Sequence, residues 1–108
     1  MKYLYRDERT RALFENDRKF LKAFGAAALK RRDRRLNELA NYDNVAELLR
    51  LGGSGPGRWH LLDDRNGGVH EGKISGDLTG KLRILLSPAD KPYGTAQRVI
   101  ILEIKDTH

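Results

Sequence analysis

The chain has 108 residues, 39% of them hydrophobic, and no cysteine, which suits one domain with a single core and excludes disulfide bridges and thiolate metal sites. No segment approaches the roughly 18 apolar residues of a membrane span, and the N-terminus lacks a signal peptide's apolar region, so we expect a soluble cytoplasmic protein with no membrane partner. The net charge of +6 lies entirely in residues 1–41, which hold 12 Lys and Arg against 6 Asp and Glu, and this favours phosphate backbones or an acidic protein as a partner.

Short elements flank the N-terminal half. Residues 1–4 predict an edge strand, and Asp7 or Thr10 is suited to cap a short helix that follows. Residues 43–51 predict another short helix, with Asp43 as its N-cap.

Residues 17–40 predict the main helix. Gly25 is a weak point inside it that would permit close packing. The expected apolar stripe consists of Leu21, Phe24, Ala28, Leu36 and Leu39. A dense basic cluster lies in the same helix and is formed by Lys30, Arg31, Arg32, Arg34 and Arg35. A nucleic-acid-binding surface and a solvated helix face explain this cluster equally well.

The second half changes to strand-like patterns. Residues 52–57, rich in glycine, predict a flexible connector, and they lack the Gly-Lys-Ser/Thr of a phosphate-binding P-loop. Asn66-Gly67 favours a hairpin turn. Strands are predicted at about 58–62, 69–75, 81–87 and 97–104. Helices followed by closely spaced strands indicate a single α+β domain over 1–108, with N-terminal helices packed on a small twisted antiparallel sheet.

The last two strands have different patterns. In the third, Leu82, Ile84 and Leu86 alternate with Arg83, so the arginine is expected on the face opposite the apolar row. The last is apolar on both faces from Val99 to Leu102, which predicts an interior position in the sheet.

Two histidines and two charged residues suggest acid–base chemistry on an RNA phosphodiester. Such cleavage needs a base for the 2′-hydroxyl, an acid for the leaving 5′-oxygen and a cation for the phosphorane charge. His60 and His108 can serve as base and acid in either order, Asp106 can orient an imidazole or act as base, and Arg83 can hold phosphate oxygens. The alternative for His108 is a solvated chain end.

Other chemistries find weaker support. His70 is a third candidate, although a polar position on a strand's solvent-facing side is the better interpretation. No His-x3-His or His-Glu-x-x-His spacing occurs, so we expect no metal site, and nothing indicates a cofactor. No serine lies in a nucleophile elbow.

Several segments, in this order and spacing, are similar to motifs of one family. They are Leu21-Lys22-Ala23-Phe24-Gly25, Leu36-Asn37-Glu38-Leu39-Ala40, Arg58-Trp59-His60-Leu61-Leu62, the run from Lys81 to Ala89, and the run from Ile101 to His108. With them the chain resembles the HigB-like killer toxins of the RelE/ParE superfamily, the toxin halves of bacterial type II toxin–antitoxin pairs.

The resemblance implies a metal-independent endoribonuclease that cleaves mRNA on the translating ribosome and is inhibited by a cognate antitoxin, a HigA-like helix-turn-helix protein. By position, His60, Asp106 and His108 fall on the family's catalytic set and Arg83 on its strand arginine. The basic helix would then face ribosomal RNA.

The chain departs from the family pattern at two places. Thr107 replaces the usual tyrosine and cannot stack on a base, and Asp63 and Asp64 put carboxylates near the expected phosphate site, where Arg65 is a substitute cation that would also bind RNA. Two alternatives therefore stay open: a non-enzymatic, ParE-like toxin that binds DNA gyrase, and an inactive relative that only binds its antitoxin.

Overall fold

The N-terminal elements begin where short polar side chains cap them. The computed structural model describes residues 1–63 and 69–106; it opens with β1 (Lys2–Tyr5) and α1 (Glu8–Glu15). The Asp7 carboxylate accepts a hydrogen bond from the Thr10 backbone N–H at 2.8 Å, which confirms Asp7 as the helix cap.

The predicted main helix is two helices. The chain breaks at Gly25, whose φ of 92° and ψ of 171° end α2 (Asp17–Phe24) and start α3 (Ala26–Asn41). Glycine adopts this backbone without steric cost. A Cβ at Gly25 would meet nothing within 4 Å, so the expectation of close packing there was wrong. The break lets α2 turn back, and its Phe20 ring packs 5.5 Å from the Phe14 ring of α1.

The next segment is also more ordered than predicted. Helix α4 (Val45–Leu49) is shorter than expected and is capped by Asn44, not Asp43, through a 2.9 Å bond from the Glu47 backbone N–H. The glycine-rich connector forms two short 3-10 turns, at Gly52–Ser54 and Pro56–Arg58, and Gly57 is buried.

The strands form one sheet of the order β1-β5-β4-β3-β2 within the described residues. Strands β2 (His60–Asp63), β3 (Val69–Asp77), β4 (Leu82–Pro88) and β5 (Arg98–Asp106) are antiparallel neighbours. This confirms the α+β prediction and the interior position of the last strand. The edge strand β1 runs parallel to β5, so the sheet is mixed. A hairpin would force β1 and β5 to run antiparallel. The long chain between them allows either relative direction of the two strands.

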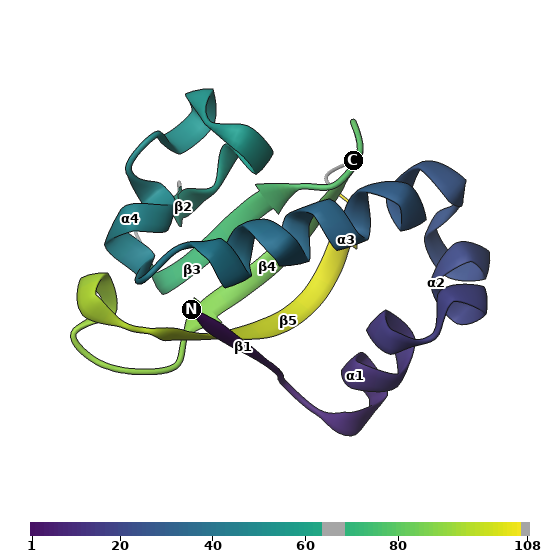
Figure 1. Ribbon diagram of the computed structural model, residues 1–108, viewed down its shortest axis with the longest axis horizontal. Coiled ribbons are helices and arrows are strands. Elements are labelled where there is room, and N and C mark those ends of the chain that lie inside the picture. Colours follow the sequence, from purple (N-terminus) through teal and green to yellow (C-terminus); the bar gives the residue numbers. More distant parts are fainter. Residues whose placement is uncertain (64–68, 107–108) are drawn as a thin grey trace.

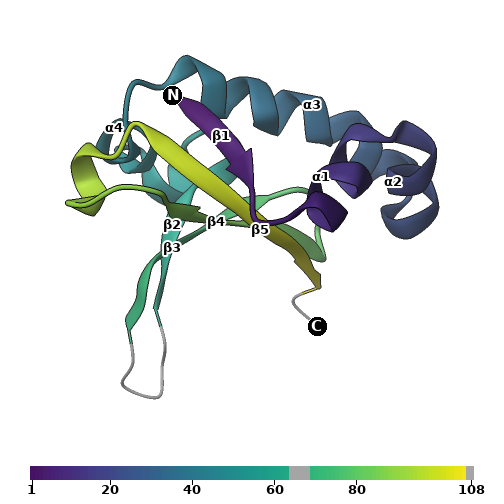
Figure 2. The same cartoon turned by 90° about the horizontal axis from the view of Figure 1, so that it is seen from below.

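The helices lie on one side of the sheet (Figures 1 and 2). Between the layers lie the buried apolar side chains, among them Phe14, Phe20, Leu39, Trp59, Ile74, Ile84, Leu86, Val99 and Ile101. In Figure 2, β2 and β3 extend away from the helices, toward the same side as the C-terminal end of β5. Among the described residues, no helix is long and apolar enough to cross a membrane.

Candidate functional site on the helix-free face of the sheet

Strand register decides which side chains share the face opposite α3, called here the helix-free face. Directly paired residues point to the same side of a sheet. Asp77, Arg83 and Lys105 are paired across β3, β4 and β5, and their pleat is opposite to that of the core residue Ile84. Arg83 therefore lies on the predicted face.

His60 belongs to the neighbouring row on the same face. It pairs with Ser75, which pairs with Leu85, and Leu85 pairs with Glu103. Two strand spacings and two residues along the strand separate the His60 and Arg83 backbones, which is about 12 Å. A single phosphodiester with its flanking sugars can be contacted from both sides at such a separation, because both side chains extend from the backbone.

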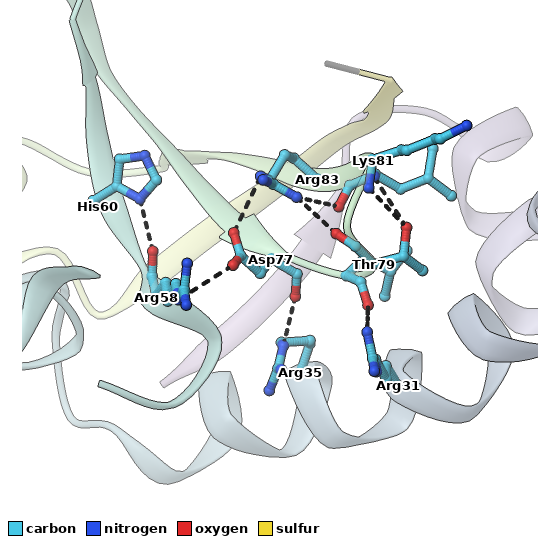
Figure 3. Close-up of polar contacts among 10 residues, drawn as sticks. Arg31, Arg35, Arg58, His60, Asp77, Thr79, Lys81 and Arg83 are labelled. Carbon is cyan, nitrogen blue, oxygen red and sulfur yellow. Dashed lines mark hydrogen bonds and ion pairs between the residues drawn. The ribbon is translucent and has the colours of Figure 1, made fainter. Parts of the chain in front are cut away.

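Asp77 joins Arg83 to a second arginine (Figure 3). The Arg83 Nε lies 3.1 Å from Asp77 Oδ1, and the Arg58 Nε lies 3.6 Å from Asp77 Oδ2. The Arg83 and Asp77 side chains are 23% and 24% exposed, whereas Arg58 is 68% exposed. One carboxylate thus bridges two guanidinium groups from distant parts of the sequence.

Arg83 is also fixed by the turn between β3 and β4. Its Nη1 donates to the backbone carbonyls of Thr79 at 2.7 Å and Leu82 at 3.1 Å. Its Nη2 donates to no other group in the described part of the chain. The side chain therefore keeps one free N–H pair while its direction is set by three contacts.

The orientation of His60 follows from one hydrogen bond. Its Nδ1 lies 2.7 Å from the backbone carbonyl of Arg58, and the ring is exposed. Because a carbonyl only accepts, Nδ1 carries the proton in this bond, which leaves Nε2 of the neutral ring as a proton acceptor. In this tautomer the Nε2 atom of His60 carries no proton.

Trp59 anchors the segment that carries Arg58 and His60. Its ring is 1% exposed and covers Gly76, where a Cβ would come within 2.2 Å of the ring. Its Nε1 donates to Glu38 of α3 at 2.9 Å. Gly57 has a φ of 75°, and a Cβ there would lie 2.5 Å from the Glu38 carboxylate. Arg58 itself has a φ of 50°, a strained conformation for a non-glycine residue beside the site.

Three arginines of the predicted basic surface donate hydrogen bonds to backbone carbonyls, although Arg31 stays exposed. Arg31 donates to the Leu78 carbonyl at 3.3 Å and Arg35 to the Asp77 carbonyl at 2.6 Å, so both tie the β3–β4 turn to α3. Arg32, with 8% of its side chain exposed, donates to the Phe14 carbonyl at 3.0 Å. These contacts correct the expectation that all five cations face RNA.

Carboxylates keep Arg32 charged inside the fold. Burial lowers its pKa, but hydrogen bonds to Asp17 and Asp33 outweigh this effect and raise the pKa above its ordinary value. Lys30 and Arg34 are exposed, and neither has a side-chain partner among the described residues. The outward positive charge of α3 therefore rests on these two residues, with Arg31 partly available.

Of the remaining predicted catalytic residues, the structure describes Asp106, and it does not share the face of His60 and Arg83. Asp106 pairs with Leu82, a residue packed against the core. Asp106 therefore faces the helix side of the sheet, at the end of β5. His108, Thr107, Asp64 and Arg65 lie outside the described residues, as do the side chains of Asp63 and His70. In the described ranges, no group of three or more His, Asp or Glu could hold a metal ion.

Sequence reasoning missed two members of the site. Arg58 belonged to a recognised motif but was given no role, and Asp77 was not proposed as a site residue. A signal was present: Asp77 and Arg83 flank a tight turn between strands, where opposite charges pair across the hairpin.

Comparisons with known proteins give one informative match. No family model matches the chain, and no curated protein matches its sequence. A solved structure, the YoeB/ParE toxin from Agrobacterium tumefaciens, aligns over 100% of both chains with a TM-score of 0.58 and 14% identity. The two chains share one fold. At this identity the similarity shows the fold alone, and any chemistry must be argued from this chain's own residues.

Proposed function

We propose that this chain is the toxin of a type II toxin–antitoxin pair and that it cleaves mRNA on the ribosome without a metal ion. The observation that most directly supports this proposal is the position of Arg83. Asp77 and the β3–β4 turn hold it on the same face as His60. The toxin fold of the solved structure supports the toxin assignment.

The proposed reaction is an internal transfer at phosphorus. His60 Nε2 takes the proton of the 2′-hydroxyl, the 2′-oxygen bonds to phosphorus, and the bond from phosphorus to the 5′-oxygen breaks. Arg83 offsets the charge that develops on the non-bridging oxygens. With His60 as the base, this proposal gives the role of the acid that protonates the 5′-oxygen to His108, with Asp106 as the carboxylate that orients its imidazole.

Outward cations would hold the toxin on ribosomal RNA. Lys30 and Arg34 are exposed on α3, and Arg65 is retained from the sequence interpretation. Arg32 and Arg35 are assigned to the fold because their guanidinium groups are bound inside it. The inhibiting partner in this proposal is a HigA-like helix-turn-helix antitoxin.

The test is induction of the chain in bacteria beside His60→Ala and Arg83→Ala variants, with mRNA 5′ ends mapped across the transcriptome. We expect new ends in register with codons for the unmodified chain and a loss of about 100-fold or more in cleavage for Arg83→Ala, because a transition-state charge partner is removed. Arg18→Ala, an exposed arginine of α2, is the matched control and should still cleave.

Two results would contradict the proposal. Growth arrest without new 5′ ends would favour a ParE-like toxin that binds gyrase. No arrest from the unmodified chain would indicate an inactive relative that binds its antitoxin.

A further inference from the structure

Two guanidinium groups share the Asp77 carboxylate, and in each the Nε makes the shortest contact. Arg58 contributes its Nε at 3.6 Å and Arg83 its Nε at 3.1 Å. The three side chains together carry a net charge of +1, obtained from two arginines and one aspartate. The terminal nitrogens of Arg58 have no other partner among the described residues, and neither has Nη2 of Arg83. Both arginines thus keep donors for an anion.

This arrangement matches the oxygens of a phosphodiester. Such a group offers two non-bridging oxygens with a shared negative charge, and planar guanidinium donors recognise them with defined geometry. The two arginines reach the site from different elements, the turn before β2 and the strand β4 (Figure 3). One arginine on each side of the phosphate would fix its orientation as well as its position.

The backbone of Asp77 is tied to helix α3. Its backbone carbonyl accepts a 2.6 Å bond from Arg35 of α3, and Arg35 pairs with Glu38. Glu38 also accepts the bond from Trp59, the residue after Arg58. Helix α3 therefore fixes the backbone of both Asp77 and the segment that carries Arg58, so the fold sets where the two arginine side chains start.

We propose that Arg58, Asp77 and Arg83 form a phosphodiester clamp, in which each arginine binds one non-bridging oxygen and Asp77 is a positioning residue. This rests on the proposed function in one respect: it takes the anion to be an RNA backbone phosphate. The carboxylate has two opposed effects. It aims the guanidinium groups, and its own negative charge weakens the binding of a phosphate.

Those opposed effects give a test that a purely structural role would not pass. Binding is measured with a fluorescent RNA hexamer that carries 2′-O-methyl groups and cannot be cleaved, and turnover is measured separately in a translation reaction. For Asp77→Asn we expect hexamer binding to tighten by about fivefold, because a nearby like charge is removed. We expect the rate of cleavage to fall by about tenfold to 100-fold, because the arginines lose their alignment.

Asp90→Asn is the matched control. It removes the same charge and also breaks an aspartate–arginine pair, the one that Asp90 forms with Arg98 at 2.6 Å. That pair lies in the loop after β4, outside the clamp, so cleavage should stay unchanged and hexamer binding should change less than in Asp77→Asn.

Arg58→Gln tests the contribution of Arg58 to the clamp. This variant should fold, because the Arg58 side chain is exposed. Hexamer binding should weaken, and the slope of log K against log salt should decrease by about 0.7, the value for one phosphate contact on a single strand. A thermal melt checks that each variant is folded.

The outcomes separate the clamp from the nuclease. If the unmodified chain cleaves mRNA but Arg58→Gln and Asp77→Asn bind and cleave as it does, the clamp is wrong and the proposed function stands. A weaker hexamer affinity in folded Asp77→Asn would also overturn the clamp. If no chain cleaves mRNA and the expected affinities and salt slopes are found, the nuclease proposal fails and the clamp remains as a site for RNA backbone.

Discussion

The arginines of α3 and the arginines of the helix-free face differ in what their guanidinium groups contact. The side chains of Arg32 and Arg35 are 8% and 12% exposed, and they donate to main-chain carbonyls inside the fold. Arg58 and Arg83 share a carboxylate at the surface and keep terminal donors free. A basic run in a sequence is therefore no measure of a basic surface.

Helical geometry explains why the α3 arginines turn inward. Ala28, Arg32 and Leu39 are the buried residues of α3, and their spacing is that of one helix face. The apolar stripe expected from the sequence contains Ala28 and Leu36. Position 32 lies between them on the same face but holds an arginine and not an apolar residue. A long side chain with an apolar stem can occupy such a gap if its charged end finds acceptors, which Phe14 and Asp17 supply here.

The largest effect on stability is expected from removing an inward arginine. Arg32→Met keeps most of the side-chain volume but leaves the Phe14 carbonyl without its buried donor, which should cost about 2 kcal/mol of unfolding free energy. For a domain of this size the melting temperature should fall by about 10 °C. Arg34 is exposed and lies outside the buried face of α3. Arg34→Met should therefore change the free energy of unfolding by no more than about 0.5 kcal/mol. Equal losses in the two variants would remove the distinction drawn between these arginines.

A smaller effect is expected from the outward cations. Replacing Lys30 and Arg34 together by Gln should weaken ribosome binding several-fold and reduce the salt slope by about 1.4, while the melting temperature stays constant. Arg18→Gln with Lys19→Gln, two exposed cations of α2, makes the same change in charge elsewhere. If the α2 pair has the same effect as the α3 pair, net charge and not the α3 surface determines binding.

The smallest effect is on the pKa of Tyr5, which the charge of the buried Arg32 influences. Burial, followed by the neighbouring Tyr3 and Glu15, raises the pKa of Tyr5 to about 12, against the opposing influence of Arg32 and Arg11. Because the folded pKa lies above the ordinary value of 10.0, the neutral phenol stabilises the fold fully below pH 10 and this stability is lost as the pH rises toward 12.

An alkaline titration followed by tyrosinate absorbance should therefore show one phenol ionising late, and Tyr5→Phe should remove it. Arg32→Met should delay it further, whereas Arg34→Met should not. A late phenol that persists in Tyr5→Phe would assign the shift to another tyrosine.

Local sequence signals predicted much of the fold. Asp7 is followed by an apolar-periodic segment, and it caps a helix as expected. The change from helical to alternating patterns after residue 57 gave the strands and the α+β class. The break at Gly25 and the ordered 3-10 turns were missed, because both depend on backbone angles that glycine permits but does not require.

The candidate site was predicted in part. Strand alternation placed Arg83 on the face where the structure has it, whereas the motif around His60 predicted a role and not a face. The pairing of Asp106 with Leu82 puts it on the other pleat, which the terminal motif could not show, because register depends on a partner strand. Asp77 and Arg58 gained their roles only from hairpin geometry.

By itself the sequence determined the order of the elements, the class of the fold, the place of the charge along the chain and the face on which Arg83 lies. Periodicity, caps and turns act between near neighbours and can be recognised locally. Only the tertiary structure decided which arginines are buried, which carboxylate joins Arg58 to Arg83 and which face Asp106 takes. Long charged side chains have many rotamers, and the acceptors that select among them come from distant parts of the chain.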